Sequence, residues 1–194
     1  MRLLSLLLIL GSCADAAIVQ VTPPDEATRG PQTDRWLAEV LRIAQDGDWL
    51  VVRGYHPTDD LVVAATNIPL SHAAVLDKQH GRIIEAVGEG VRFQELRAFV
   101  HGTHRLLIIR PKWWSPKRGA RAVRLSQELV GRSYDFLGAV GDPQPESFYC
   151  SELAMHVYRK YFNGPEHMPR VIEPGQMYLW GSILWDSGWR DDQP

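Results

Sequence analysis

Cys150 is one of only two cysteines in this chain of 194 residues, and it opens a segment, CSELAMHVYRKY, that has helical periodicity. Apolar side chains recur three and four positions apart along this segment, at Cys150, Leu153, Ala154, Val157, Tyr158 and Tyr161. The polar stretch DPQPES before it predicts a loop, so the thiol falls in the first turn of the helix, where unpaired amide groups and the helix dipole favour a thiolate. Cys150 is therefore either a nucleophile or a small apolar residue of the core.

The other cysteine, Cys13, lies in an N-terminal segment with the features of an export signal. MRLLSLLLILGSCADAA has one positive charge at Arg2, an apolar run over residues 6–10 and small residues after it. The run is too short to span a bilayer, which takes about 20 apolar residues. Residues 10–13 resemble a bacterial lipobox, which would make Cys13 the lipidated first residue of the mature protein, whereas cleavage at residues 14–16 would release a soluble product. The position of the apolar run favours the lipoprotein.

Either cleavage leaves Cys150 without an intrachain partner, because Cys13 is then acylated or removed. A disulfide framework is thereby excluded. A free thiol in an oxidising compartment has to be buried or to serve a chemical function. We expect an exported protein of the bacterial cell envelope, attached to the membrane through the lipid on Cys13 and facing the periplasm.

The composition predicts one ordinary globular domain. Hydrophobic residues make up 45% of the chain and charged residues 23%, and 21 basic against 23 acidic residues leave a formal net charge of -2. This balance gives no positive electrostatic potential that would attract nucleic acid, so we expect no nucleic-acid partner.

The order of the elements predicts an α+β fold. Residues 1–12 are expected to be the signal peptide, residues 13–32 the processed end and a Pro-rich tether, and residues 33–194 the domain. A helix is expected over residues 33–48, capped by Thr33, and another over residues 116–130, capped by Ser115. Five short apolar runs between them predict strands, at residues 49–55, 61–66, 71–77, 82–87 and 104–111, the third and fourth forming a hairpin.

His72 is the strongest candidate for a base that could activate Cys150. It lies in the apolar strand SHAAVLD, where an imidazole needs a partner, and Glu85 is the one acidic residue of the facing strand RIIEAV. Either the two side chains pair, or Glu85 faces water on an edge strand.

The other histidines give weaker signals. His56, His80 and His156 are interpreted as solvent-facing. His101 and His104 could share a helical face as metal ligands, but Gly102 separates them and no third ligand is evident, so we expect no metal site.

Five segments carry a resemblance to a known family: GDWLVV (47–52), SHAAVL (71–76), IIEA (83–86), YDF (134–136) and FYCSEL (148–153). They resemble the circularly permuted papain-like amidases of the YiiX and YaeF type, within the NlpC-like cysteine hydrolase superfamily. The closing VIEPGQMY (171–178) is similar to the segment that follows the nucleophile helix in that group. The order of histidine before cysteine also agrees with the permuted branch.

The resemblance implies a small antiparallel β barrel or curved sheet packed against the helix of Cys150. The same resemblance implies that Cys150 is the nucleophile, that His72 is the general base and then the acid, and that Glu85 orients His72. It implies no metal or other cofactor. The substrate would be a peptide or an acyl amide, cleaved through a thioester. Tyr134 and Tyr149 are second-tier candidates for lining the pocket, and Glu152 is expected to have a structural role at the helix start.

The residue types leave the substrate and the functional class open. A cell-envelope amidase could act on a murein peptide or on an N-acylated amine. An acyltransferase or lipid hydrolase of the lecithin:retinol acyltransferase type is one alternative, although its nucleophile segment has a cysteine followed by glutamate and histidine, whereas here Ser151 follows Cys150. A non-catalytic, ligand-binding lipoprotein is the other. Trp113, Trp114 and Lys117 could contact a membrane surface or an amphiphilic substrate, or the tryptophans could seal the core.

Overall fold

The computed structural model describes residues 20–162 and 169–190. Within them, six strands form one sheet in the order β4-β3-β2-β1-β5-β6, and every neighbouring pair is antiparallel. The strands are β1 (Trp49–Gly54), β2 (His72–Asp77), β3 (Arg82–Val87), β4 (Gly90–Glu95), β5 (Thr103–Pro111) and β6 (Gly181–Asp186). The predicted α+β fold is confirmed, with an open sheet rather than a closed barrel.

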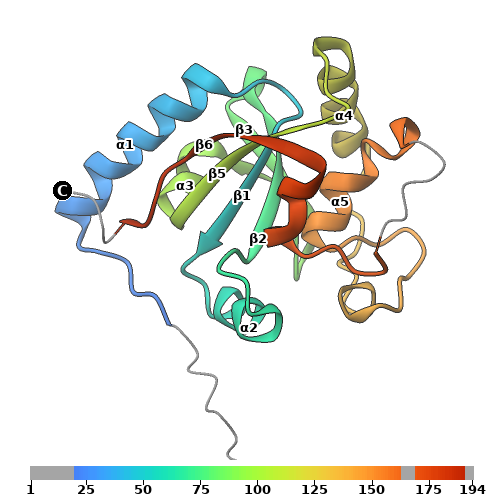
Figure 1. The fold of residues 1–194 in the computed structure, drawn as a ribbon, viewed down its shortest axis with the longest axis horizontal. Helices are drawn as coiled ribbons and strands as arrows, with labels where there is room; N and C mark the ends of the chain where they lie inside the picture. Colours follow the sequence, from blue (N-terminus) through green and yellow to red (C-terminus); the bar gives the residue numbers. More distant parts are fainter. Residues whose placement is uncertain (1–19, 163–168, 191–194) are drawn as a thin grey trace, which may run out of the picture.

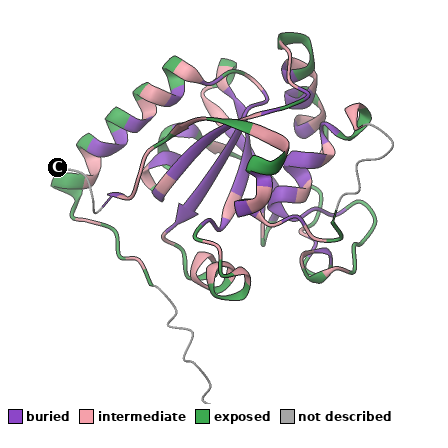
Figure 2. Ribbon diagram, viewed as in Figure 1, coloured by how far each residue is buried: buried purple, intermediate pink, exposed green. Residues whose placement is uncertain are grey.

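Helices cover both faces of this sheet (Figure 1). One face packs against α1 (Glu26–Ile43) and α3 (Leu96–His101), through a core that includes Leu50, Ala74 and Ile83. The other face packs against α4 (Pro116–Glu128) and α5 (Cys150–His156), through a core that includes Val51 and Ala73. Because alternate strand residues point to opposite faces, the central strands are apolar without interruption, and β1 and β2 are almost wholly buried (Figure 2).

Two predicted elements that position the site are confirmed. The hairpin consists of β2 and β3, joined by the 3₁₀ turn η1 (Lys78–His80) and by Gly81, whose φ of 63° suits a residue without a side chain. Helix α4 begins after Ser115, whose side chain accepts a hydrogen bond from the Arg118 amide at 3.3 Å.

The strand predicted over residues 61–66 is wrong, because these residues belong to helix α2 (Pro57–Thr66). His56 caps the helix through its ring, Pro57 occupies the first position and the Asp59 carboxylate accepts the His56 amide hydrogen at 2.9 Å. No residue of α2 is buried. The apolar run therefore does not join the sheet, and the capping residues before it decide its conformation.

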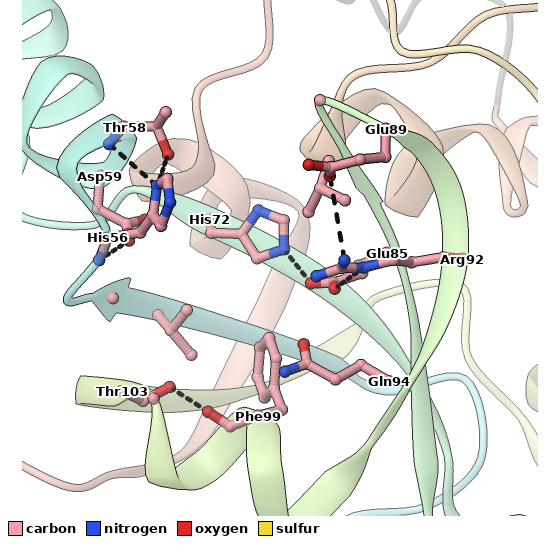
Figure 3. Close-up of a pocket in the computed structure, with 15 residues that line it drawn as sticks. His56, Thr58, Asp59, His72, Glu85, Glu89, Arg92, Gln94, Phe99 and Thr103 are labelled. Carbon is pink, nitrogen blue, oxygen red and sulfur yellow. Dashed lines mark hydrogen bonds and ion pairs between the residues drawn. The ribbon is translucent and has the colours of Figure 1, made fainter.

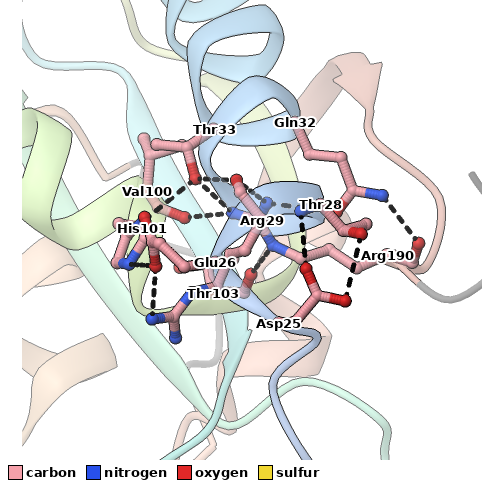
Figure 4. Close-up of polar contacts among 10 residues, drawn as sticks. All are labelled: Asp25, Glu26, Thr28, Arg29, Gln32, Thr33, Val100, His101, Thr103 and Arg190. Carbon is pink, nitrogen blue, oxygen red and sulfur yellow. Dashed lines mark hydrogen bonds and ion pairs between the residues drawn. The ribbon is translucent and has the colours of Figure 1, made fainter.

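The first helix begins earlier than predicted, at Glu26 rather than near Thr33, with Asp25 as its cap. The predicted tether therefore overlaps the helix. Thr33 is fully buried in the second turn, where its hydroxyl contacts the buried guanidinium of Arg190 at 3.2 Å (Figure 4). Arg190 also donates to the carbonyls of Val100 (2.7 Å) and Thr103. These contacts hold the end of the described chain against α1 and α3. They were not predictable from the sequence, because Gly30 and Pro31 are residue types typical of a linker.

Helix α5 is shorter than the apolar periodicity predicts, since it ends at His156. The Tyr158 amide bonds to the Met155 carbonyl at 3.0 Å, which tightens the chain, and the Tyr158 hydroxyl donates to the Gly47 carbonyl at 3.0 Å. The periodic side chains still face inward, because Leu153, Ala154, Val157 and Tyr158 are all buried. Further 3₁₀ turns follow the chain as η2 (Gly138–Val140), η3 (Arg159–Tyr161) and η4 (Pro174–Trp180).

Three elements were not predicted: β4, α3 and β6. Residues 1–19 lie outside the described structure, so the expected signal peptide and Cys13 are not part of it. In the described part of the chain, no helix has both the length and the apolar character that a membrane crossing requires.

Candidate active site

Cys150 is the first residue of α5 and is buried, with 7% of its surface exposed. Tyr149 precedes it in an extended conformation and is held at both ends: its hydroxyl accepts the Ile172 amide hydrogen at 2.9 Å, and its own amide faces the Glu152 carboxylate at 3.4 Å. Glu152 therefore caps the helix, the structural role expected for it. The thiol lies in the first turn, where backbone amides have no partner within the helix.

His72 and Glu85 reach each other across the hairpin. Ala74 lies opposite Glu85 in the register of β2 and β3, so His72, two residues before Ala74, is the diagonal neighbour of Glu85 on the same face. The His72 Nε2 and Glu85 Oε2 atoms are 2.8 Å apart. Glu85 is 2% exposed, so the alternative of a solvent-facing glutamate is excluded.

Arg92 completes the surroundings of Glu85 and was not predicted. It lies directly opposite Glu85 in the register of β3 and β4, and its Nε donates to Glu85 Oε1 at 2.9 Å. One carboxylate oxygen thus contacts the imidazole and the other contacts a guanidinium (Figure 3). Strand β4 itself was not predicted, and without its register the sequence offers no signal that places Arg92 here.

Cys150 and His72 line the same cavity, and each lies close enough to shift the pKa of the other. Since Nε2 of His72 faces Glu85, Nδ1 is the nitrogen left for the thiol. The Ala73 backbone amide also helps to lower the pKa of the thiol. His72 thus contacts Glu85 and lines one cavity together with Cys150.

The surroundings shift the pKa values of this pair in opposite directions. Burial alone would raise the pKa of Cys150, but the hydrogen bond and positive charge of His72 outweigh it and lower the pKa of the thiol. Burial alone would lower the pKa of His72, but its hydrogen bonds with Cys150 and Glu85 raise that pKa well above the ordinary value. Both shifts favour a thiolate beside an imidazolium.

A cavity of about 380 Å³ opens on the sulfur side of this pair. Cys150, Tyr134 and Tyr149 line it, together with apolar side chains from α2, from the end of β3 and from the segments 136–139 and 171–174. The two tyrosines, the second-tier candidates, are thus among the residues that line this cavity. Burial raises the pKa of Tyr149 to about 12, so its hydroxyl stays protonated at neutral pH.

A second cavity, of about 410 Å³, lies on the Glu85 side of His72 (Figure 3). Its lining is more polar and includes His56, Glu89, Arg92 and Gln94. His72 lines both cavities.

Four other histidines contact residues other than Cys150. His101 contacts Thr33 and Glu26, and His104 packs against the Tyr55 ring. His56 is exposed, whereas His156, expected to face solvent, is half-buried against the Phe148 ring. Among residues 20–162 and 169–190, no group of three or more His, Cys, Asp or Glu side chains could hold a metal ion.

The tryptophans proposed for membrane contact lie largely inside the protein. Trp113 is 5% exposed and packs against Phe162 with ring centroids 4.4 Å apart, and the Trp114 ring nitrogen donates to the Asp46 carbonyl at 3.0 Å. These contacts support the other interpretation, in which the tryptophans seal the core.

Comparison with known families gives a match over more than half of the chain. The model of the family described as permuted papain-like amidase enzyme, YaeF/YiiX, C92 family, matches residues 53–175, a range that holds His72, Glu85 and Cys150. No protein among the curated ones matches the chain.

A solved structure shares the fold. It is the crystal structure of metalloprotein yiiX from Escherichia coli O157:H7, with a TM-score of 0.50 and 21% sequence identity. The match covers 60% of this chain and 65% of that chain, slightly less than two thirds of the latter's length. At this identity the likeness concerns the fold alone.

Proposed function

This chain belongs to the family of permuted papain-like amidases of the YaeF/YiiX type, and on that basis we propose that it is a cysteine amidase with Cys150 as nucleophile, His72 as base and acid, and Glu85 as the orienting group. The observation that carries the proposal is the 2.8 Å contact between His72 Nε2 and the buried Glu85 carboxylate, made by a histidine that lines one cavity together with Cys150. A thiolate hydrolase needs these three groups in this order.

The first half of the proposed reaction forms a thioester. Nδ1 of His72 takes the proton of the Cys150 thiol, and the sulfur attacks the carbonyl carbon of an amide. The amide of Cys150, at the start of α5, supplies one donor to the oxyanion. His72 then gives its proton to the amide nitrogen, the C–N bond breaks and the amine leaves, with the acyl group on the sulfur.

The second half returns the enzyme to its starting state. His72 takes a proton from a water molecule as the water oxygen attacks the thioester carbonyl. The C–S bond breaks, the sulfur recovers the proton and the carboxylic acid leaves. Glu85 holds the imidazole through Nε2 in both halves, so that Nδ1 always faces the sulfur and the reacting carbonyl.

The similar protein of known crystal structure is described as a metalloprotein. The donor set of this chain does not fit such a site in the part that the structure describes, where no group of three or more suitable side chains converges. No step of the proposed reaction therefore passes through a metal.

The proposed setting is the bacterial cell envelope, with membrane attachment through a lipid on Cys13. The leader-like composition of the first residues supports it. The proposed substrates are a murein peptide or an N-acylated amine, both of which present an amide bond in that compartment.

Loss of turnover in two variants tests the mechanism. Cys150→Ala and His72→Ala should each abolish hydrolysis of an amide or an activated ester, while circular dichroism shows an unchanged fold. Turnover retained by either variant would remove the assigned roles. A protein that binds ligand with equal affinity in wild type and Cys150→Ala and turns over no substrate would instead be a binding lipoprotein.

A further inference from the structure

A third cavity, here called the basic cavity, lies between α4 and η3 and has a volume of about 350 Å³. It shares no lining residue with the two cavities beside His72. Helices α4 and α5 lie on the same side of the molecule, and η3 follows α5, so the basic cavity lies beyond the end of the helix that Cys150 begins (Figure 1). Most of the lining residues are basic: they are Ser115, Lys117, Arg118, Arg121, Arg124, Lys160 and Tyr161.

Helix α4 places four of these basic side chains on one face. Lys117, Arg121 and Arg124 follow one another at intervals of four and three residues, and Arg118 lies three residues before Arg121. Like charges at these spacings repel each other and destabilise a helix. Glu128 is the one acidic residue of α4, and it forms no ion pair with any described residue. The helix therefore carries a repulsion that its own side chains do not offset.

Arginines elsewhere in the protein are commonly paired with carboxylates. Such ion pairs are formed by Arg29, Arg42, Arg53, Arg82, Arg92, Arg97, Arg105, Arg110 and Arg132. Within residues 20–162 and 169–190, by contrast, the basic side chains of the basic cavity form no ion pair. The cavity thus concentrates positive charge in a chain whose formal net charge is -2.

Two of the guanidinium groups have surroundings that suit an anion site. Arg118 is held in place, because it donates to the Trp113 carbonyl at 3.0 Å and lies 4.5 Å from the centroid of the Tyr161 ring. The Nε of Arg121 is buried and has no hydrogen-bond partner among the described residues. A buried donor without an acceptor is unfavourable, and an anion in the cavity that Arg121 lines would supply one once the side chain turns toward it.

The chemistry of these side chains favours phosphate as the anion. A guanidinium matches two phosphate oxygens with two parallel hydrogen bonds. One phosphate group carries up to about two negative charges, so the positive charges around the cavity are better balanced by two such groups than by one. The volume of about 350 Å³ lies at the lower end of the range of about 300–1,000 Å³ that small-molecule sites occupy.

We propose that the basic cavity binds a ligand with two neighbouring phosphate groups, either a soluble diphosphate or the headgroup of a phospholipid. Arg121 and Arg124 hold the phosphates from α4, and Lys160 closes the site from η3. This binding site is additional to the proposed amidase activity and does not depend on it, since binding can be measured without turnover.

Isothermal titration of the full-length protein with inorganic pyrophosphate tests the site. Pyrophosphate should bind at least about tenfold more tightly than inorganic phosphate or succinate, and more weakly as the salt concentration rises. The double variant Arg121→Gln/Arg124→Gln should raise the Kd for pyrophosphate at least about tenfold, because two charge-assisted contacts are lost.

A matched control separates this site from a general effect of charge. Arg42→Gln/Arg132→Gln changes the net charge by the same amount at exposed arginines outside the cavity, and its Kd should equal that of the wild type. Lys160→Gln, on η3, should weaken binding severalfold and tests the site without any change to α4. Circular dichroism should show the same fold for every variant.

Vesicles distinguish the two sources of the phosphate groups. Sedimentation with phosphatidylcholine vesicles is compared with and without an equal amount of cardiolipin, whose headgroup carries two phosphates. Cardiolipin-dependent binding that Arg121→Gln/Arg124→Gln loses and Arg42→Gln/Arg132→Gln keeps would assign the site to a membrane headgroup, whereas binding of pyrophosphate alone would assign it to a soluble diphosphate. Succinate bound as tightly as pyrophosphate, no binding of either phosphate probe, or equal affinities in wild type and Arg121→Gln/Arg124→Gln would overturn the inference and leave the amidase proposal intact.

Discussion

His72 and Glu85 are diagonal neighbours on adjacent antiparallel strands, and their Nε2 and Oε2 atoms lie 2.8 Å apart with the carboxylate buried. This contact fixes the imidazole in one orientation, since the strand holds the backbone and the carboxylate holds the distal nitrogen. It also explains why a carboxylate can lie in an apolar strand, because His72 and Arg92 supply the partners that its burial demands.

Replacing Glu85 should weaken catalysis without removing it. Glu85→Gln keeps the side-chain volume but loses the charge that stabilises an imidazolium. We therefore expect kcat to fall about 100-fold, to a value between those of the wild type and of His72→Ala, which should be inactive. Arg92→Gln should lower kcat only several-fold, because Arg92 acts through Glu85 and is half-exposed. The measurement is kcat and KM against pH.

The pH profile separates a positioning role of Arg92 from a merely structural one. Burial alone would raise the pKa of Glu85, but the contacts with His72 and then with Arg92 outweigh that effect and lower it. Removal of the Arg92 charge should raise the pKa of Glu85. Arg92→Gln should therefore move the acid limb of the activity profile to higher pH. Arg97→Gln, on α3 and paired with Asp34, is the control and should leave the profile unchanged. An Arg92→Gln profile that coincides with wild type would contradict the positioning role.

Cys150 should react as an activated thiol. Its pKa is lowered because the contact with His72 outweighs burial, so alkylation by iodoacetamide should persist well below the ordinary thiol pKa of about 8.5 and decline only as the pH falls through the lowered value. In His72→Ala the burial remains without the partner, so the midpoint should rise above the wild-type value. The rate of alkylation against pH measures both.

Two results would contradict this assignment. A thiol that stays inert at every pH until the protein unfolds would make Cys150 a packing residue. A midpoint that is the same in wild type and His72→Ala would show that the imidazole does not activate the sulfur.

The sequence predicted the parts of the site that local patterns determine. The alternation of SHAAVLD and RIIEAV indicated a hairpin, and an ionisable residue in each apolar strand indicated that His72 and Glu85 pair. The periodicity after Cys150 placed the thiol on an inward face. These patterns depend on residues that are close together in the chain, so the elements that they predict are present in the structure.

The rest depends on contacts between distant segments. The apolar run of α2 was interpreted as a strand because its valines favour one. His56 and Pro57 instead begin a helix there, and none of its residues is buried, so this helix lies over the cleft. The Arg92 contact requires the register of β4, and the early start of α1 requires Arg190, which lies 158 residues beyond its partner Gln32 in the sequence. No local pattern carries that information.

The leader-like composition of the first residues predicts where the protein resides. If the lipobox interpretation is right, Cys13→Ser should move the protein from the membrane fraction to the soluble fraction, because the thiol that accepts the lipid is gone. Fractionation of cells followed by immunoblotting measures the distribution, with Cys150→Ser as a control that should stay in the membrane fraction. A wild type that is already soluble would favour the alternative cleavage at residues 14–16.

Asp135 should control the shape of the cavity beside Cys150 through the loop that it holds. Asp135→Ala leaves the buried amide of Gly138 and the amide of Gln144 without their acceptor, which should lower the free energy of unfolding by about 1–3 kcal/mol. The loosened loop should also raise KM, since Phe136, which lines the cavity beside Cys150, loses its fixed position. Asp142→Ala, an exposed change in the same loop, should alter neither quantity. Urea denaturation and steady-state kinetics provide the two measurements, and a stable Asp135→Ala protein with unchanged KM would show that the loop does not depend on this carboxylate.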